Sequence, residues 1–238
     1  MKLFRKIAIF FFDLIDKYIH QKKILSSLKK LKKKINIYVD VGSHFGLYAD
    51  LIDTNYNPEK IFLFEPQNKI FKIIEKKYET LSKFKVNNFA VSDDNIVKNL
   101  NINKHDLTSS FTEINKNNLY LNYKAKLFGG SLSQMILNIE KVETVRLDNY
   151  LDKEKINTID LIKIDTEGHE FQVLKGLGKK ISNVGIILIE FHNDNIYLNY
   201  ESAKIHNYLE KNGFDLAEKI KFPFTEWEDR IYLNSLKK

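Results

Sequence analysis

The 238 residues suffice for one full-size domain with a short appendage, and a hydrophobic content of 43% separates the chain from disordered proteins. The chain has no cysteine, which excludes disulfide scaffolds, thiolate zinc sites and cysteine nucleophiles and fits a cytoplasmic protein. Residues 1–34 contribute +9 to the net charge of +7 and the rest of the chain contributes −2, so the basic charge does not indicate a nucleic-acid-binding surface on the main part.

Residues 1–34, which we call the N-terminal arm, have the pattern of amphipathic helices. Their apolar residues recur at steps of three and four: Ile7, Phe10, Phe11, Leu14, Ile15, Tyr18, Ile24, Leu25, Leu28 and Leu31. The continuous apolar run of residues 7–12 is much shorter than the ~18 residues of a membrane span, so we predict no transmembrane segment. We expect the arm to pack on the main domain or on the second subunit of a homodimer. The alternative is peripheral contact with anionic lipid at the inner face of the membrane.

Residues 35–238 alternate between strand and helix patterns, which predicts one α/β domain with a mostly parallel seven-stranded sheet and helices on both faces. The expected strands cover residues 35–41, 60–65, 85–91, 159–165, 184–191, 214–220 and 230–233. The expected helices start near residue 45, cover 70–81 and 203–211, and include 171–177. We interpret residues 101–143 as an insertion that recognises the substrate.

The turn after the first predicted strand carries two glycines, Gly42 and Gly46, where the backbone must bend tightly. A dinucleotide-binding turn would have a third glycine where Asp40 stands. A carboxylate at this place disfavours a pyrophosphate and suits a ligand with a cationic end, such as S-adenosylmethionine. Glu65 ends the second predicted strand, 25 positions after Asp40, where an acidic side chain can accept both ribose hydroxyls of an adenosine.

Several short blocks of the sequence resemble FkbM-type methyltransferases, in the order in which that family has them. The blocks are residues 40–46, 64–66, 88–93, 145–150, 159–170, 173–176 and 189–192. The resemblance implies a class I methyltransferase fold, which is Rossmann-like, with S-adenosyl-L-methionine as methyl donor. It also implies O-methylation of a sugar or another hydroxylated metabolite, as in the biosynthesis of surface polysaccharide. The donor-binding residues expected from these blocks are Asp40, Gly42, Ser43, His44, Gly46, Glu65, Pro66, Ser92 and Asp165.

The reacting centre is expected where the fourth and fifth strands end, because ligands of such sheets lie beyond the carboxyl ends of the strands. His192 and His169 are the two candidates for the general base, since imidazole titrates in the required range. Asp165 is expected to orient the base or to bind the amino group of the donor. The residues expected to contact the acceptor are Ser109, Ser110, Glu167 and Glu190.

A divalent metal is a further alternative for this centre. Asp165, Glu190 and His192 are hard or borderline ligands that suit Mg²⁺ or Mn²⁺. No spacing in the sequence demands a metal, and we predict none.

Three classes of function remain to be compared. The basic arm favours a nucleic-acid methyltransferase, but enzymes that methylate base amines place a Pro-Pro-aromatic motif where this chain has residues 165–168, Asp-Thr-Glu-Gly. Acidic residues there would also repel a phosphate backbone. A non-enzymatic binding module would not need Asp40, Glu65 and Asp165 together. We therefore predict a small-molecule acceptor, a sugar or nucleotide-activated sugar, and no nucleic acid.

Overall fold

The computed structural model describes residues 14–103, 109–118, 121–122, 136–193, 195–223 and 225–237. The strands are β1 (Ile37–Val41), β2 (Lys60–Phe64), β3 (Phe84–Asn87), β4 (Ala90–Val91), β5 (Val97–Asn103), β6 (Ile136–Val145), β7 (Ile159–Ile164), β8 (Val184–His192), β9 (Phe214–Lys221) and β10 (Trp227–Asn234). The helices are α2 (Gln21–Leu31), α3 (Leu47–Tyr56), α4 (Asn68–Tyr78), α6 (Leu147–Lys153), α7 (Glu170–Gly176) and α8 (Ser202–Lys211), with short helical turns η1 (Asp16–His20), η4 (Gly178–Asn183) and η5 (Ser235–Lys237).

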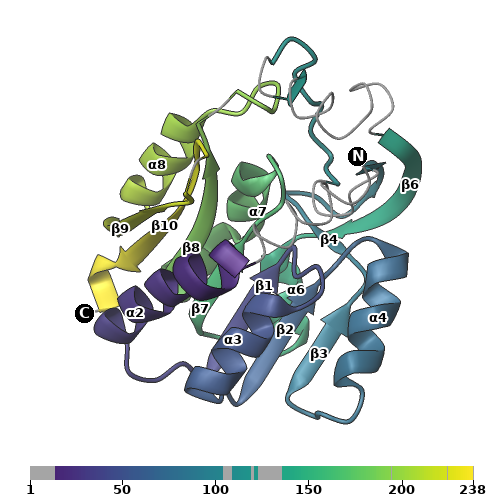
Figure 1. Ribbon diagram of the computed structural model, residues 1–238. Coiled ribbons are helices and arrows are strands. Elements are labelled where there is room, and N and C mark those ends of the chain that lie inside the picture. The colour runs from purple at the N-terminus through teal and green to yellow at the C-terminus, as the bar shows by residue number, and fades with distance from the viewer. Residues whose placement is uncertain are drawn as a thin grey trace.

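The main sheet has seven strands in the order β3-β2-β1-β7-β8-β10-β9 (Figure 1). Only β10 runs antiparallel to its neighbours, β8 and β9. The prediction of a mostly parallel seven-stranded sheet is thus confirmed. The chain leaves β1 toward β2 and β3 on one side and later returns to β7 on the other, so the strand order reverses between β1 and β7. Such a reversal opens a crevice at the carboxyl ends of the strands.

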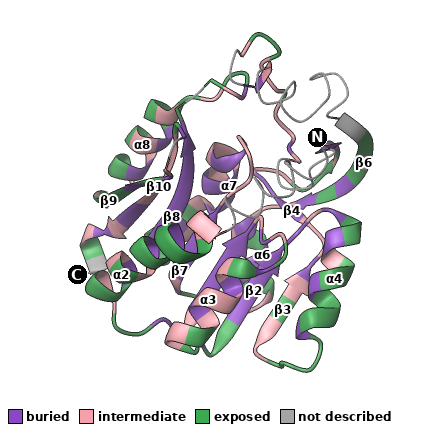
Figure 2. Cartoon of the chain, viewed as in Figure 1, coloured by how far each residue is buried: buried purple, intermediate pink, exposed green. Residues whose placement is uncertain are grey.

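Helices cover both faces of this sheet, as the alternating pattern predicts. Side chains of α6, α7 and α8 share one apolar cluster with the sheet, and those of α2, α3 and α4 share another. All nine residues of β8 are buried, which explains why this run is almost wholly apolar (Figure 2). Burial of each large apolar side chain stabilises the fold by roughly 1.5–3 kcal/mol.

The described part of the N-terminal arm packs on the sheet. Ile24 and Leu28, one turn apart on α2, are fully buried in the cluster with α3 and α4, while the lysines of α2 face outward. His20 is fully buried, and its Nε2 lies 2.7 Å from Oδ2 of Asp229 on β10. The first thirteen residues of the arm lie outside the described residues. Within the described ranges, no helix has the length and the apolar run that a bilayer crossing requires.

Residues 85–91, predicted as one strand, form two strands in different sheets. β3 pairs with β2 in the main sheet, and β4 pairs with β6 in a three-stranded sheet. The break falls at two asparagines: the amide of Asn87 donates to the carbonyl oxygen of Leu63, and that of Asn88 to those of Glu65 and Pro66. Both side chains hydrogen-bond the backbone at the carboxyl end of β2, and these bonds turn the chain out of the main sheet.

A long hairpin accounts for part of the predicted insertion. β5 and β6 pair antiparallel from Val97–Glu143 to Asn103–Ile136. The sequence analysis did not predict these two strands, and residues 104–108, 119–120 and 123–135 of the insertion lie outside the described residues. The described piece at 109–112 returns to the carboxyl ends of the main strands.

Candidate active site

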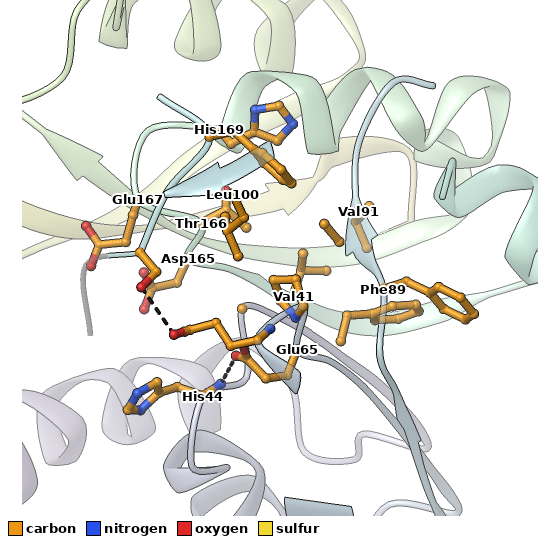
Figure 3. A pocket seen from close by; sticks show the side chains of 17 residues that line it. Val41, His44, Glu65, Phe89, Val91, Leu100, Asp165, Thr166, Glu167 and His169 are labelled. Carbon is orange, nitrogen blue, oxygen red and sulfur yellow. Dashed lines mark hydrogen bonds between the residues drawn. The ribbon is translucent and has the colours of Figure 1, made fainter. Parts of the chain in front are cut away.

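A cavity of about 110 Å³ lies at the carboxyl ends of β1, β2, β4 and β7. Figure 3 shows Asp165 and Glu167 on one side of it, and Phe89 and Val91 on the other. The cavity therefore has an acidic end and an apolar end. This polarity suits a ligand with a cationic group at one end and an aromatic ring at the other.

The glycine turn between β1 and α3 forms one wall of the cavity. Gly42 has a φ of 80°, and a Cβ there would lie 1.8 Å from the carbonyl oxygen of Asp165. Gly46 has a φ of 73°, and its Cβ would lie 2.4 Å from the hydroxyl oxygen of Tyr78. Both positions thus need glycine, because the backbone is left-handed and its neighbours are too close for a side chain.

Glu65 follows β2 and is 2% exposed. Its Oε2 accepts a hydrogen bond from the backbone N–H of His44 at 3.0 Å, and its Oε1 accepts one from the N–H of Gln67 at 2.8 Å. Burial raises the pKa of Glu65 to about 7, although the two backbone donors oppose that shift. The carboxylate is fixed at the cavity and keeps lone pairs for further donors.

Asp40 is buried but does not line the cavity. It lies opposite Lys163 in the register of β1 and β7. Burial raises the pKa of Asp40 to about 6, and the charge of Lys163 opposes the shift. Burial lowers the pKa of Lys163, but the carboxylates of Asp165 and Asp40 outweigh it, so the net shift is upward; Nζ lies 2.8 Å from Oδ2 of Asp165. Asp40 thus lies behind the glycine turn, and its donor contact stays a prediction.

The other predicted donor-binding residues differ in their position. His44 and Pro66 line the cavity. Ser43 and Ser92 are buried and do not line it: Ser43 Oγ donates to the carbonyl oxygen of Phe64, and Ser92 Oγ accepts a hydrogen bond from Lys98 Nζ. The apolar lining residues that the sequence analysis did not assign are Val41, Phe64, Phe89, Ala90, Val91, Leu100 and Phe111. Five of them lie in the blocks at 40–46, 64–66 and 88–93, which the sequence analysis had singled out.

The ends of β7 and β8 bring three side chains together, Glu167, Glu190 and His192, which we call the acidic cluster. One carboxylate oxygen of each glutamate and one ring nitrogen of the histidine lie within 4.8 Å of one another. The two strands are parallel neighbours, as expected. Burial raises the pKa of both glutamates well above the usual value, and the carboxylates of Glu190 and Asp165 add to the shift of Glu167. The hydroxyl of Tyr197 donates to Glu167.

The two predicted histidine bases have different environments. His192 belongs to the acidic cluster, with Nε2 3.1 Å from Oε2 of Glu190. His169 lines the cavity but contacts Ser92, whose Oγ is 3.1 Å from its Nε2, and the ring of Phe111. Burial lowers the pKa of His169 to about 4. His169 is therefore a neutral and weakly basic group at neutral pH.

The segment at 109–112 closes the cavity between β2 and β7. Ser109 Oγ donates to Oε1 of Gln67 at 3.2 Å and lines the cavity. Ser110 Oγ donates to the carbonyl oxygen of Glu167, and Thr112 Oγ1 to that of Gly168. Of the two serines expected to contact the acceptor, Ser109 faces the cavity and Ser110 holds the loop after β7.

The fold has counterparts among known proteins. A crystal structure of methyltransferase FkbM from Methylobacillus flagellatus matches with a TM-score of 0.56 and 14% identity, over 84% of this chain and 43% of that chain. A putative rRNA-methylase from Clostridium thermocellum matches with a TM-score of 0.51 and 12% identity, over 90% of this chain and 94% of that one. At such low identity these likenesses concern the fold alone. Together with the strand order they define a class I methyltransferase fold.

The family follows from the sequence of the chain. The model of the methyltransferase FkbM domain matches residues 40–216, and the chain belongs to this family. Hexuronic acid methyltransferase AglP from Haloferax volcanii is 29% identical over 51 residues, which are 21% of this chain and 21% of that protein. The chain thus matches about a fifth of this curated relative and less than half of the FkbM crystal structure.

Proposed function

We propose that the chain is an S-adenosylmethionine-dependent O-methyltransferase that acts on a hydroxyl of a sugar or nucleotide-activated sugar. The observation that carries the proposal is the buried carboxylate of Glu65, fixed by two backbone N–H groups beside the glycine turn. An adenosine in the cavity would donate its ribose hydroxyls to Glu65 and place its base against Phe89 and Val91. Its methionine end would then lie toward Asp165.

Methyl transfer needs an aligned acceptor and a place for its proton. S-adenosylmethionine, when bound, would supply the methyl group: the acceptor oxygen would form the new bond to the methyl carbon, and the sulfur would leave with the electron pair of the carbon–sulfur bond as a neutral thioether. We assign the hydroxyl proton to His192, because its imidazole lies beside Glu190, which can stabilise the imidazolium. Alignment contributes about 7–11 kcal/mol in well-ordered systems, and a general base adds ~10²–10⁴-fold.

The choice of a sugar acceptor rests on two supports. The one curated relative that we describe above acts on a hexuronic acid, as its name states. The acidic side of the cavity, with Asp165 and Glu167, disfavours a phosphate backbone near the reacting centre. Hydroxyl groups of a sugar would find acceptors in these carboxylates.

The proposal is tested by incubating the purified chain and S-adenosylmethionine with hexuronic acids and nucleotide-activated sugars, scored by a mass gain of one methylene group. We expect product on a sugar, and none with Glu65→Ala, which removes the carboxylate that binds the donor. Circular dichroism of the variant serves as the control for folding. Methylation of RNA or DNA in place of sugars would contradict the proposed acceptor, and unchanged donor affinity of Glu65→Ala would contradict the proposed donor site.

A further inference from the structure

The acidic cluster brings two carboxyl groups together with an imidazole beside the carboxyl group of Asp165. Glu167 and Glu190 are held together with Asp165 next to them, as their mutual electrostatic effects indicate. Lys163 forms an ion pair with Asp165, with Nζ 2.8 Å from Oδ2. Glu190 is buried and Glu167 is half-buried, and carboxylates placed together in this way are costly unless they are protonated or paired with a cation.

The imidazole of His192 is a second and independent observation. His192 is 7% exposed, and within the described part of the chain neither of its ring nitrogens forms a hydrogen bond. Its Nε2 is directed at the cluster, 3.1 Å from Oε2 of Glu190, an oxygen that also lacks a hydrogen bond there. A buried polar group without a partner costs about 1–3 kcal/mol. A ligand between these atoms would use both.

The rings around His192 restrict its orientation. Tyr197 and Tyr200 pack edge-on against the imidazole, with ring centroids 4.8 and 5.4 Å away. Tyr197 also donates its hydroxyl hydrogen to Glu167, which orients that carboxylate. Partners that orient a metal-binding side chain in this way are typical of metal sites.

From this arrangement we infer that Glu167, Glu190 and His192 bind one divalent cation of the Mg²⁺ or Mn²⁺ type. Two carboxylates and one imidazole are the ligand types that such ions accept. Ligand atoms about 2.1 Å from one ion lie about 3 Å apart when adjacent and about 4 Å apart when opposite. The three ligand atoms lie within 4.8 Å of one another, so small rotations of the glutamate side chains would bring them to these separations.

The consequence for catalysis, though not the cation site itself, rests on the proposed function. Three protein ligands leave coordination positions open for water or for the acceptor hydroxyl. A cation bound there lowers the pKa of that hydroxyl. His192 then serves as a ligand through Nε2, and the hydroxyl loses its proton to solvent or to a neighbouring carboxylate. The role of His192 as base in the proposed function therefore applies to the protein without the cation, and the bound cation replaces it.

The test uses the full chain, treated with a chelator and titrated with Mn²⁺, with free Mn²⁺ followed by its electron paramagnetic resonance signal. We expect one saturable site per chain. Glu190→Gln and His192→Gln should each weaken it by at least about tenfold. The matched control is the double variant His206→Gln with Glu210→Gln, which removes a pair on α8 formed by a half-buried histidine and an exposed glutamate 3.4 Å apart. It should bind Mn²⁺ as the unchanged chain does.

A second measurement keeps the inference testable if the cluster variants fail to fold. The pulsed electron paramagnetic resonance signal of Mn²⁺ bound to the unchanged chain should be modulated by the nitrogen nucleus of one coordinated imidazole. No saturable Mn²⁺ binding, or binding without that modulation, would overturn the inference. Calorimetry with S-adenosylmethionine is run in parallel: donor binding without Mn²⁺ binding refutes the cation site and leaves the proposed function, and the reverse result refutes the proposed function alone.

Discussion

Replacement of Glu65 by glutamine should change how the stability of the protein depends on pH. The carboxyl is buried, and its pKa rises from the usual 4.5 to about 7, mainly through burial and slightly through the charge of Asp40. The folded state therefore binds this proton more tightly than the unfolded state does. The resulting stabilisation is fully present below pH 4.5 and is lost as the pH rises through about 7. Glutamine cannot ionise and lacks this loss.

The expected size follows from the shift. A pKa change of this extent corresponds to about 3 kcal/mol in the free energy of unfolding. The glutamine amide faces the backbone N–H groups of His44 and Gln67, only one of which its oxygen can satisfy, and this costs about 1–3 kcal/mol at every pH. The pH-independent cost shifts the whole curve of Glu65→Gln and leaves its pH dependence unaffected.

The assay is urea unfolding of both proteins at a series of pH values between about 4 and about 8. Subtraction of the two curves cancels the other titrating groups, since both proteins share them. The free energy of unfolding of Glu65→Gln relative to the unchanged chain should rise by about 3 kcal/mol across this range. A difference that stays constant with pH would refute a buried carboxyl with a raised pKa at this position.

Three further predictions concern the glycine turn, the buried ion pair of the N-terminal arm and the binding of the methyl donor. Gly42→Ala places a Cβ against a backbone carbonyl and should lower the free energy of unfolding by at least about 3 kcal/mol. Gly213→Ala also has a positive φ, but its Cβ would only be in ordinary van der Waals contact with Leu236, so it should cost about 1 kcal/mol. Equal costs in urea unfolding would contradict the close approach at Gly42. His20→Ala leaves the carboxylate of Asp229 buried without its partner and should cost about 3 kcal/mol by the same assay, with Asp229→Asn costing much less. Binding of S-adenosylmethionine at pH 7 should release about half a proton per chain, because the ribose hydroxyls favour the ionised form of Glu65. Calorimetry in two buffers of different ionisation enthalpy measures the number of protons released. Zero release would contradict the contact between the ribose and Glu65.

The sequence predicts those parts of the fold that depend on local burial. The runs at β1, β2, β7 and β8 are apolar because the strands are covered on both faces, and their predicted bounds agree with the structure within two residues. The β5–β6 hairpin could not be predicted in this way. Its strands are rich in polar residues and pair across a long insertion, so their formation depends on contacts distant in sequence.

The candidate site was accessible to prediction wherever its residues lie at strand ends. Glu65, Asp165, Glu190 and His192 meet at one edge of the sheet because parallel strands end there together. Tyr197 was not predicted, since it belongs to the segment after β8. Its backbone pairs with that of Ile114, and its hydroxyl donates to Glu167. The pattern of β1 also gives no sign that the Asp40 side chain faces Lys163 and not the cavity.

A crystal structure of the chain with S-adenosylhomocysteine bound would test the central claim most directly. The account predicts the ribose hydroxyls within hydrogen-bond distance of the Glu65 carboxylate, the adenine beside Phe89, and the sulfur facing the acidic side of the cavity. A ligand bound elsewhere on the chain, or an adenosine whose ribose does not contact Glu65, would contradict it.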